Sequence, residues 1–418
     1  MPDTYTPPPP IWAPEPGPAK ARGLCTDCGL SRGPMAKACG RACQFIRPDY
    51  EGAERRVHGR EAGATGDEAF FGVIHGMHRA RLDPPSEGAQ WTGITTRLAA
   101  RLLETGAVDA VLTMVPDPHD RWRPRAAIIT EAEGMAAARG MRMGYAPLLA
   151  LLEPARAAGH RRIAVIGIPC QVYALRQIEA ALDFESITVI GTPCSDNTTT
   201  ENFHHFLSRL TDRPEAVSYL EFRADYHVEL RFDDGARREI PFLKLPLSDL
   251  PGYFFPLTCR TCVDYTNRLA DITVGYMGGE GDQWLIVRNA RGAALLAGLG
   301  DEIRLEAPGT AGKRKGAVAG FIQNTERAAG GLPLRRMPGW ARGIVGWLQP
   351  RIGPRGIEFA RARLEMKAAE TVLHLRRAYP HRMKWMIPDH VWRLVAPYGL
   401  TPEEGERHAA AETQTGRP

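Results

Sequence analysis

The sequence predicts an α/β protein with a mixed, largely parallel sheet core, a cysteine-bearing N-terminal segment and a C-terminal helical extension. Two observations predict this fold class. From about residue 68 to residue 288, apolar runs typical of buried strands alternate with helical patterns, an order that favours parallel strand pairing. After residue 331 the apolar residues recur at helical spacing.

The N-terminal part divides into three stretches. Eight prolines among the first 20 residues predict a disordered arm over residues 1–20. A compact segment with four cysteines follows, and the charged, glycine-rich tract 51–67 is interpreted as a connector. Together these two stretches form an N-terminal segment over residues 21–67.

The α/β core is assigned to residues 68–330. Residues 107–115 and 162–168 have the apolar character of buried strands, and residues 96–104, before the first of these strands, and 172–181, after the second, have a helical pattern. A strand-rich patch further along the chain carries an Asp-Asp-Gly turn and predicts an antiparallel hairpin over residues 218–240.

The C-terminal region is predicted to be helical over residues 331–401, with a disordered tail over residues 402–418. An amphipathic helix is expected because five apolar residues recur at helical spacing: Phe359, Ala362, Met366, Ala369 and Leu373. Charged residues, among them Arg361, Glu365 and Arg376, lie off this stripe.

The chain has 418 residues, of which 44% are hydrophobic and 24% are charged, as in ordinary globular proteins. We expect a cytoplasmic protein, because no apolar run approaches the roughly 20 residues of a membrane helix and no secretory signal pattern is visible. Structural disulfides are rare in that compartment. Metal ligation is therefore the leading explanation for the eight cysteines.

The net charge of +5 is unevenly distributed. Residues 331–400 hold 13 Lys and Arg against 4 Asp and Glu, a balance of +9, which leaves −4 for the remainder. This basic region also holds four of the eight tryptophans: Trp340, Trp347, Trp385 and Trp392. It favours an acidic redox protein or the surface of a pigment membrane as partner rather than nucleic acid. The alternative is helix packing with a solvated basic face.

The N-terminal cysteines have the pattern Cys25-x2-Cys28-x10-Cys39-x3-Cys43. Short spacers allow one loop to wrap a metal centre. A structural zinc ion takes four thiolates tetrahedrally, and a 4Fe–4S cluster takes the same four, one per iron. The spacing leaves both alternatives open.

The second group of cysteines is dispersed. Cys170 and Cys194 each follow an apolar strand in a Gly-x-Pro-Cys motif, and each motif is predicted to open a helix. Both thiols are then expected at the carboxyl ends of neighbouring parallel strands, where open sheets bind ligands, with thiol pKa values lowered by the helix N-termini. Cys259 and Cys262 complete this set of four, and small buried hydrophobic side chains are the alternative interpretation of the strand-end pair.

Two cysteine clusters suggest electron transfer to a flavin or to a substrate. No Gly-x-Gly-x-x-Gly motif follows a strand, but two other stretches offer a flavin contact or ordinary turn chemistry. One opens a helix and contains Thr92, Gly93, Thr95 and Thr96, and the other follows a strand and contains Gly275, Tyr276, Met277 and Gly278.

Two segments resemble signatures of a known family. Residues 166–176, Ile-Gly-Ile-Pro-Cys-Gln-Val-Tyr-Ala-Leu-Arg, and residues 259–278, which begin Cys-Arg-Thr-Cys-Val-Asp-Tyr, are similar to the beta subunits of deazaflavin-coenzyme-reducing hydrogenases and dehydrogenases. The extra N-terminal cysteines, the stretch 194–201, the Tyr-Met-Gly motif and the stretch 353–361 resemble a chlorophyll-pathway branch of that family. This branch includes ferredoxin-dependent divinyl (proto)chlorophyllide 8-vinyl reductases and 7-hydroxymethyl chlorophyll a reductases.

The resemblance spans about residues 20–400 and implies FAD and two 4Fe–4S clusters. By position, one cluster would be held by Cys25, Cys28, Cys39 and Cys43, and the other by Cys170, Cys194, Cys259 and Cys262. The two glycine- and threonine-bearing stretches then become FAD contacts. Where relatives have Gly-Ser-Lys-Tyr this chain has Gly-Met-Arg-Met at 140–143, so Arg142 would replace the charge of that lysine.

The implied activity is ferredoxin-dependent reduction of the 8-vinyl group of divinyl (proto)chlorophyllide to ethyl in (bacterio)chlorophyll biosynthesis. Two alternatives keep the cofactors: reduction of 7-hydroxymethyl chlorophyll a or of a deazaflavin coenzyme. A third is a non-catalytic electron-transfer subunit of a larger complex. His75, His78 and Tyr226 are candidate acid–base residues that the sequence does not assign, and the oligomeric state, including a homo-oligomer, stays open.

Overall fold

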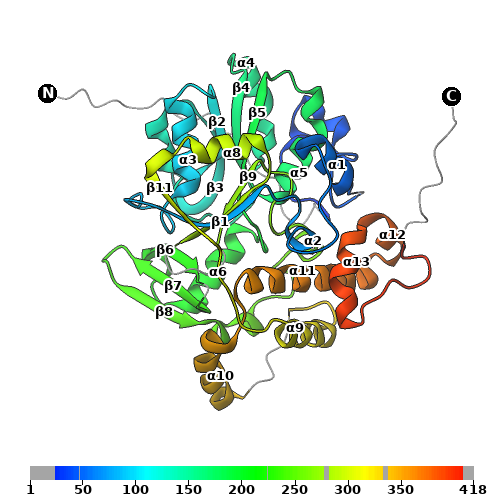
Figure 1. Cartoon of the computed structure of the whole chain (residues 1–418). Coiled ribbons are helices and arrows are strands. Elements are labelled where there is room, and N and C mark those ends of the chain that lie inside the picture. The colour runs from blue at the N-terminus through cyan, green and yellow to red at the C-terminus, as the bar shows by residue number, and fades with distance from the viewer. Residues whose placement is uncertain (1–23, 47, 224, 277–281, 333–337, 408–418) are drawn as a thin grey trace.

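The computed structural model describes residues 24–46, 48–223, 225–276, 282–332 and 338–407 (Figure 1). The predicted N-terminal arm and most of the predicted tail lie outside these ranges. The described chain contains an eight-stranded sheet in the order β11-β1-β10-β9-β5-β4-β2-β3. Its strands are β1 (Gly76–Leu82), β2 (Ala110–Asp117), β3 (Asp120–Ile129), β4 (Arg162–Gly167), β5 (Ser186–Gly191), β9 (Ile272–Gly275), β10 (Gln283–Val287) and β11 (Ile303–Glu306).

Parallel pairing is confined to the four central strands, because β2 pairs with β4, β4 with β5 and β5 with β9 in parallel register. The outer strands β3, β10, β1 and β11 are antiparallel to their neighbours. The mixed α/β class with a parallel centre is therefore confirmed. Parallel strands in the middle of a sheet need cover on both faces, which fits their continuous apolar sequences.

Two helical layers provide that cover, and the side chains of each strand alternate between them. On β4, Ile163 and Val165 face one apolar cluster and Ala164 faces the other. The face of Ala164 is covered by α3 (Ile94–Glu104) and α8 (Ala290–Ala297). The other is covered by α5 (Pro169–Ile178), by the N-terminal segment and by the C-terminal helices.

A second, three-stranded sheet confirms the predicted hairpin and adds a strand to it. Its strands β6 (Val217–Phe222), β7 (His227–Phe232) and β8 (Arg237–Pro241) are antiparallel, and α6 (Thr200–Leu210) packs on them through a separate apolar cluster. Figure 1 places this sheet beside the C-terminal helix layer. The Asp-Asp-Gly turn joins β7 and β8 as expected.

The tract 51–67 is not only a connector, which corrects the sequence interpretation. Helix α1 (Tyr50–His58) begins at Asp49, whose side chain accepts a hydrogen bond from the Gly52 N–H, and ends at Gly59 in the left-handed conformation. Its buried Tyr50 and Ala53 belong to the main apolar cluster. Because most of its side chains are charged or polar, the sequence does not reveal the small apolar face through which this helix packs. The short α2 (Glu68–Phe71) follows.

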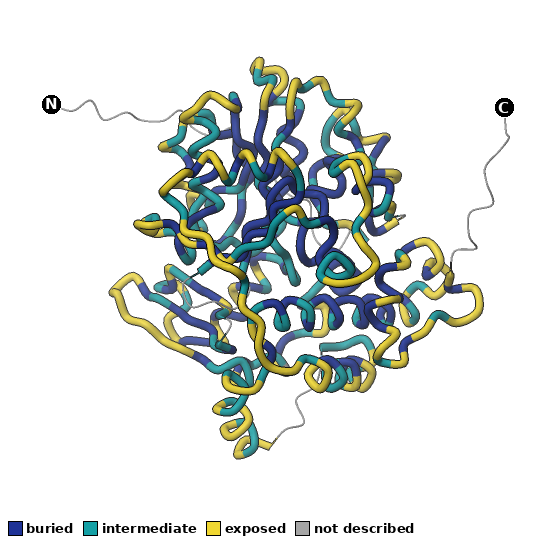
Figure 2. Tube along the Cα trace, in the orientation of Figure 1, coloured by how far each residue is buried: buried dark blue, intermediate teal, exposed yellow. Residues whose placement is uncertain are grey.

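The C-terminal region is helical as predicted, with α9 (Lys315–Ala328), α10 (Gly339–Ile352), α11 (Ile357–Ala378), α12 (Met383–Met386) and α13 (Asp389–Val395). Helix α11 differs from the expected amphipathic helix, since Glu365, Lys367 and His374 are buried together with its apolar residues. Figure 2 shows it mostly in the colours of buried and intermediate residues. The region also extends past residue 401, because Glu406 is buried and paired with Arg376.

A buried ion pair joins α5 to the sheet. The Arg176 guanidinium donates to the Asp271 carboxylate over 2.9 Å, and both side chains are fully inaccessible to solvent. Asp271 also accepts hydrogen bonds from the Val189 N–H of β5 and from the side chains of Asn289 and Arg291. This carboxylate therefore fixes α5, β5 and the start of β9 relative to one another.

We expect Asp271→Ala to lower the free energy of unfolding by about 3–5 kcal/mol, because it leaves the Arg176 charge buried without this partner. Urea denaturation monitored by circular dichroism measures the change. Asp183→Ala is the matched control: it removes an aspartate whose pair with Arg161 is exposed, and it should leave the denaturation midpoint close to that of the wild type. Equal midpoints for the two variants would contradict the role given to Asp271.

Candidate functional site

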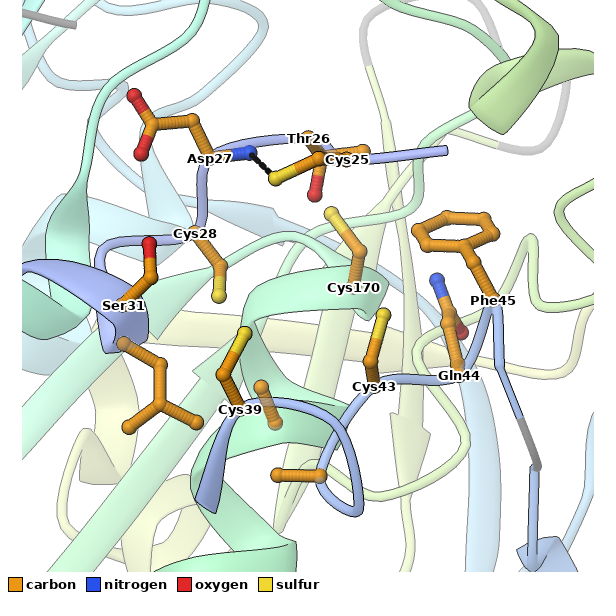
Figure 3. A pocket seen from close by; sticks show the side chains of 13 residues that line it. Cys25, Thr26, Asp27, Cys28, Ser31, Cys39, Cys43, Gln44, Phe45 and Cys170 are labelled. Carbon is orange, nitrogen blue, oxygen red and sulfur yellow. Dashed lines mark hydrogen bonds between the residues drawn. The ribbon is translucent and has the colours of Figure 1, made fainter. Parts of the chain in front are cut away.

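Five cysteines line one cavity at the end of the central sheet (Figure 3). They are the four N-terminal cysteines, Cys25, Cys28, Cys39 and Cys43, together with Cys170 from the first turn of α5. The N-terminal four come from a segment with two short 3₁₀ turns, Leu30–Arg32 and Pro34–Ala38. The structure therefore brings the predicted first set together and places one member of the predicted second set beside it.

The N-terminal segment is held against the core by its backbone. The Leu149 N–H donates to the Cys28 carbonyl over 2.8 Å. At Gly29, which has a φ of 102°, a Cβ would lie 2.5 Å from the Pro147 carbonyl oxygen. Only glycine permits both this left-handed conformation and this close approach. The Asp27 N–H also donates to the Cys25 sulfur, so the loop turns toward the cavity.

Burial makes the thiolate forms of these cysteines costly without a bound cation. Desolvation raises the pKa of Cys28 to about 12 and the pKa of Cys43 to about 11. The pKa of Cys170 is raised well above its usual value for the same reason. The lowered pKa expected for Cys170 at this helix N-terminus is wrong, because burial of the thiol raises its pKa. Metal binding reverses this cost, since a coordinated thiol is deprotonated.

The second set gathers at the carboxyl ends of β4 and β5, as the sequence predicts, but not through two identical motifs. Cys170 is the second residue of α5. Cys194 follows β5 in an extended segment, and α6 begins only at Thr200, so the predicted helix opening at Cys194 is wrong. Its N–H donates instead to the Tyr265 carbonyl over 3.0 Å. The Cys194 motif is thus positioned by the loop that follows Cys262.

Cys259 lies in the short helix α7 (Leu257–Arg260), and Cys262 follows it. The Asn197 N–H approaches the Cys259 sulfur at 3.4 Å, and the Gln44 side-chain amide approaches the Cys262 sulfur at 3.6 Å. Donors of this kind stabilise negative charge on sulfur. Because Gln44 follows Cys43 directly, its contact links the two cysteine sets.

Two features of the sheet edge set the spacing of the strand-end cysteines. The Asn267 side-chain amide donates to the Gly167 carbonyl over 2.7 Å and to the Thr192 carbonyl over 3.3 Å, which joins the two Gly-x-Pro-Cys turns. At Gly275 a Cβ would lie 2.2 Å from the Pro193 ring. Gly275, predicted as a flavin contact, is thus required to be small for the packing of the turn that carries Cys194.

A buried lysine that the sequence did not single out supports the second set. Lys367 of α11 donates to the Cys259 carbonyl over 2.5 Å and to the Asp196 carboxylate over 2.8 Å. Burial disfavours its charge, but Asp196 and Glu370 raise the pKa of Lys367 above its usual value, so it stays cationic. Its position in the middle of an alanine-rich helix made it indistinguishable from a surface lysine in the sequence.

The two predicted flavin stretches meet in the structure. The Trp91 and Tyr276 rings stack with centroids 5.3 Å apart and an interplanar angle of 7°. Gln283 supports the loop before α3, because its side-chain Oε1 accepts hydrogen bonds from the Thr92 hydroxyl and from the Ile94 N–H, each over 3.0 Å. This convergence of segments about 190 residues apart in sequence is decided by the pairing of β1 with β10.

The individual flavin candidates differ in their surroundings. The Thr92 hydroxyl is buried against Gln283, and the Thr96 hydroxyl donates to the Gly93 carbonyl. Gly93 has a φ of 88° and caps α3, and Thr95 lies in the first turn of this helix. Met277 and Gly278 lie outside the described residues. As cofactor contacts these residues stay predictions.

A second cavity lies beside this loop and contains Arg142, the remaining predicted contact. Three arginines line it, with Trp122 and Tyr219 among their neighbours: Arg121, Arg139 and Arg142. Gly88 and Gln90 come just before the stacked Trp91 in the chain. Gly88 lines this cavity, and the Gln90 side chain donates to the carbonyl of its wall residue Leu220. The cavity and the aromatic stack are therefore adjacent.

The arginines of this cavity suit an anionic group. The Arg142 guanidinium donates to the backbone carbonyls of Met141 and Arg139, and burial lowers the pKa of Arg142 to about 10. Within the described part of the chain, the buried polar atoms near the stack and the cavity that have no hydrogen-bond partner include Arg139 Nε, Arg142 Nε and the Tyr276 hydroxyl. Buried polar groups are normally satisfied, so these atoms fit a polar ligand such as the diphosphate of FAD.

The candidate acid–base residues are not brought together. His75 is exposed, and His78 lies in β1, where burial lowers its pKa. The Tyr226 hydroxyl donates to the Pro354 carbonyl over 2.6 Å, and burial raises the pKa of Tyr226 to about 12. Tyr226 thus holds the entry to α11. None of the three lines either of the two cavities described above.

Two adjoining family descriptions match the chain. The N-terminal part of the coenzyme F420 hydrogenase/dehydrogenase beta subunit matches residues 77–153, and its C-terminal part matches residues 160–311. The chain belongs to the coenzyme F420 hydrogenase/dehydrogenase beta-subunit family. The predicted resemblance to beta subunits that act on a deazaflavin coenzyme is confirmed, and relatives of the chain that carry a functional name include a reductase and a dehydrogenase subunit.

Relatives of this beta-subunit family extend the match over nearly the whole chain. The chain is 35% identical over 392 residues to the chloroplastic 7-hydroxymethyl chlorophyll a reductase of Oryza sativa subsp. japonica, which covers 90% of this chain and 83% of the rice protein. It is 33% identical over 382 residues to the protein all1601 of Nostoc sp., which covers 91% of this chain and 94% of that protein. The chlorophyll-pathway branch is thereby supported.

A solved structure has a similar fold. The F420-reducing [NiFe] hydrogenase complex from Methanosarcina barkeri contains a chain that superposes with a TM-score of 0.51 at 20% identity, covering 57% of this chain and 84% of that one. A subunit of the F(420)H(2) dehydrogenase of Methanosarcina mazei is 27% identical over 226 residues, which cover 52% of this chain and 61% of that subunit. The N-terminal cysteines and α11 lie outside the residues matched by the two family descriptions.

We expect the protein, isolated without oxygen, to contain about eight iron and eight sulfide per chain. Cys28→Ala and Cys259→Ala should each lower both contents to about four, because each removes a ligand from one of the two sets. Ser31→Ala is the matched control, since Ser31 lines the same cavity as Cys28 without a thiol. Zinc in place of iron, or unchanged iron in both cysteine variants, would contradict the assignment.

Proposed function

We propose that this protein is a reductase of a chlorophyll-type tetrapyrrole, with reduced ferredoxin as electron donor. The observation that carries the proposal is the position of Cys170. It lines the cavity of the N-terminal cysteines although it belongs to the other set, and the side-chain amide of Gln44, next to Cys43, approaches the Cys262 sulfur of that other set at 3.6 Å. Two redox groups held by these sets would be neighbours, which suits the passage of single electrons through the chain.

The residues present fit two iron–sulfur clusters better than two zinc ions. No three His, Cys, Asp or Glu side chains in the described part of the chain converge as a single metal ion requires. The N-terminal thiols surround a cavity instead (Figure 3). Cys25, Cys28, Cys39 and Cys43 would hold one 4Fe–4S cluster, and Cys170, Cys194, Cys259 and Cys262 would hold the other. Lys367 and Gln44 would offset the negative charge of the second set.

FAD fits the region of the stacked aromatic rings and the arginine-lined cavity. Arg139 and Arg142 would bind its diphosphate, and Trp91 and Tyr276 would present aromatic surface to its rings. When bound, the clusters supply single-electron transfer and the flavin supplies hydride transfer.

We expect Arg142→Ala to weaken FAD binding by about tenfold or more, because a hydrogen bond to a charged group contributes about 1.5–3 kcal/mol. The measurement is the flavin absorbance retained after dialysis, or titration of the flavin-free protein with FAD. Arg213→Ala is the control, because Arg213 is exposed and paired with Asp234 away from the cavity. Full retention of FAD by Arg142→Ala would remove this residue from the flavin site.

The first candidate substrate is divinyl (proto)chlorophyllide, whose 8-vinyl group takes up two electrons and two protons to become ethyl. The second is 7-hydroxymethyl chlorophyll a, whose hydroxymethyl group takes up two electrons and two protons to give methyl and water. The name of the rice relative favours the second. An isolated vinyl group is a poor hydride acceptor, so the first reaction would require a donor of low potential such as ferredoxin. Reduction of a deazaflavin coenzyme is the activity class of more distant relatives.

Anaerobic incubation with reduced ferredoxin and each pigment tests the proposal. If the divinyl pigment is the substrate, we expect a product with two hydrogens more than that pigment. If the hydroxymethyl pigment is the substrate, we expect a product with one oxygen less. Mass spectrometry separates the two. Protein that carries both clusters and FAD and converts neither pigment would refute it. Reduction of a deazaflavin coenzyme alone, or activity only with a copurifying partner, would then support the alternatives.

A further inference from the structure

Helix α10 presents an unusual surface. Among the large hydrophobic side chains, Trp340 is 74% exposed, Ile344 59%, Trp347 62% and Ile352 59%. No residue of this helix is buried. In Figure 1 α10 projects from the lower end of the molecule, and Figure 2 shows its exposed residues. Scattered exposed hydrophobic residues are ordinary, but several on one helix need an explanation.

Three of these four exposed residues lie on one face. Trp340, Ile344 and Trp347 are spaced by four and three residues, so they project from the same side of the helix. The Arg351 guanidinium lies 4.1 Å from the centre of the Trp347 ring, at the end of this face. The opposite side contacts the 3₁₀ turn Phe242–Lys244, where the Leu243 side chain approaches Gly346. The apolar face therefore points away from the body.

The composition of α10 fits an anionic lipid surface rather than a protein partner. Its sequence, Gly339–Ile352, contains two arginines and no acidic residue, in a region with a balance of +9. Tryptophan is enriched where a bilayer meets water, and arginine is attracted to anionic headgroups. A helix of 14 residues is about 21 Å long, so it would lie along the interface rather than cross it. No described helix is long and apolar enough to cross a bilayer.

The other tryptophans of the basic region are less suited to this contact. Trp392 is 3% exposed and packs in the main apolar cluster, and Trp385 is 39% exposed in the separate helix α12. The sequence-based expectation that all four tryptophans contribute to one basic aromatic surface is therefore reduced to Trp340 and Trp347. The proposed contact surface is therefore limited to α10, a short helix in which no residue is buried.

We propose that α10 binds the protein peripherally to an anionic membrane, with Trp340, Ile344 and Trp347 inserted at the level of the lipid headgroups. The apolar side chains supply burial in the interface, and the basic residues supply attraction to anionic lipid. This proposal does not depend on the cofactors or on the pigment substrate. It places the protein at a surface where an apolar substrate would concentrate.

Cosedimentation of the full-length protein with vesicles tests the proposal. Vesicles of phosphatidylcholine with phosphatidylglycerol should bind the wild type, and binding should weaken in salt and on pure phosphatidylcholine. We expect the double variant Trp340→Ala/Trp347→Ala to lower the partition coefficient by about tenfold or more, because two interfacial aromatic anchors are lost. Circular dichroism and iron content should match the wild type, since neither side chain is buried.

Tyr253→Ala is the matched control, because Tyr253 is 75% exposed and lies outside α10, and this variant should bind vesicles like the wild type. Absence of wild-type binding to anionic vesicles would overturn the proposal, and so would equal binding by the double variant. A second copy of the chain is the competing occupant of this face. If the double variant changes the mass measured by light scattering while vesicle binding is absent or unchanged, α10 is an interface between copies instead.

Discussion

The buried pair between Arg176 and Asp271 is the interaction that holds the rest of the site in place. Arg176 lies about two turns after Cys170 in α5, and Asp271 directly precedes β9 beside the end of β5. Because both side chains are inaccessible to water, their charges have only each other and a few neighbouring groups as partners. A shift of α5 along the sheet would break this pair at high cost. The position of Cys170 relative to Cys194 is fixed as a consequence.

Around this fixed point, two kinds of constraint position the remaining thiols. Short backbone contacts hold the N-terminal loop on the core at Gly29 and Cys28, and Asn267 joins the two strand-end turns. Burial then determines the chemistry, because it raises the pKa of every thiol in the second set and of most in the first. A bound metal group would stabilise the thiolate forms most at such buried sites. The Gln44 amide approaches the Cys262 sulfur, and the Lys367 ammonium donates to the Cys259 carbonyl, so both lie beside the second set.

The structure also separates the surfaces that a membrane-bound reductase would need. The cysteine cavity and the arginine-lined cavity lie at the central sheet and the small sheet, whereas α10 projects from the lower end of the molecule (Figure 1). Attachment through α10 would therefore leave the N-terminal cysteines free to exchange electrons with a donor. The basic charge of the C-terminal region serves either contact, and only the exposed aromatic face distinguishes the lipid surface from an acidic protein.

Local sequence patterns were sufficient to predict the α/β class, the strand ends that carry Cys170 and Cys194, the hairpin at 218–240 and the long terminal helix. These features follow from periodicity and from turn residues, which each segment contains in full. The family signatures at 166–176 and 259–278 added the expectation of clusters and flavin, and the family is confirmed. Which groups meet depends instead on the packing of the whole chain. The contact of Gln44 with Cys262, the stack of Trp91 on Tyr276 and the ion pair of Lys367 with Asp196 join segments about 170 to 220 residues apart. Local patterns carry no information on such distances, because strand order and helix packing set them. For the same reason, the sequence predicts a connector where helix α1 lies and leaves open whether Trp392 is exposed or packed. Burial depends on what covers a segment, and that cover comes from elsewhere in the chain.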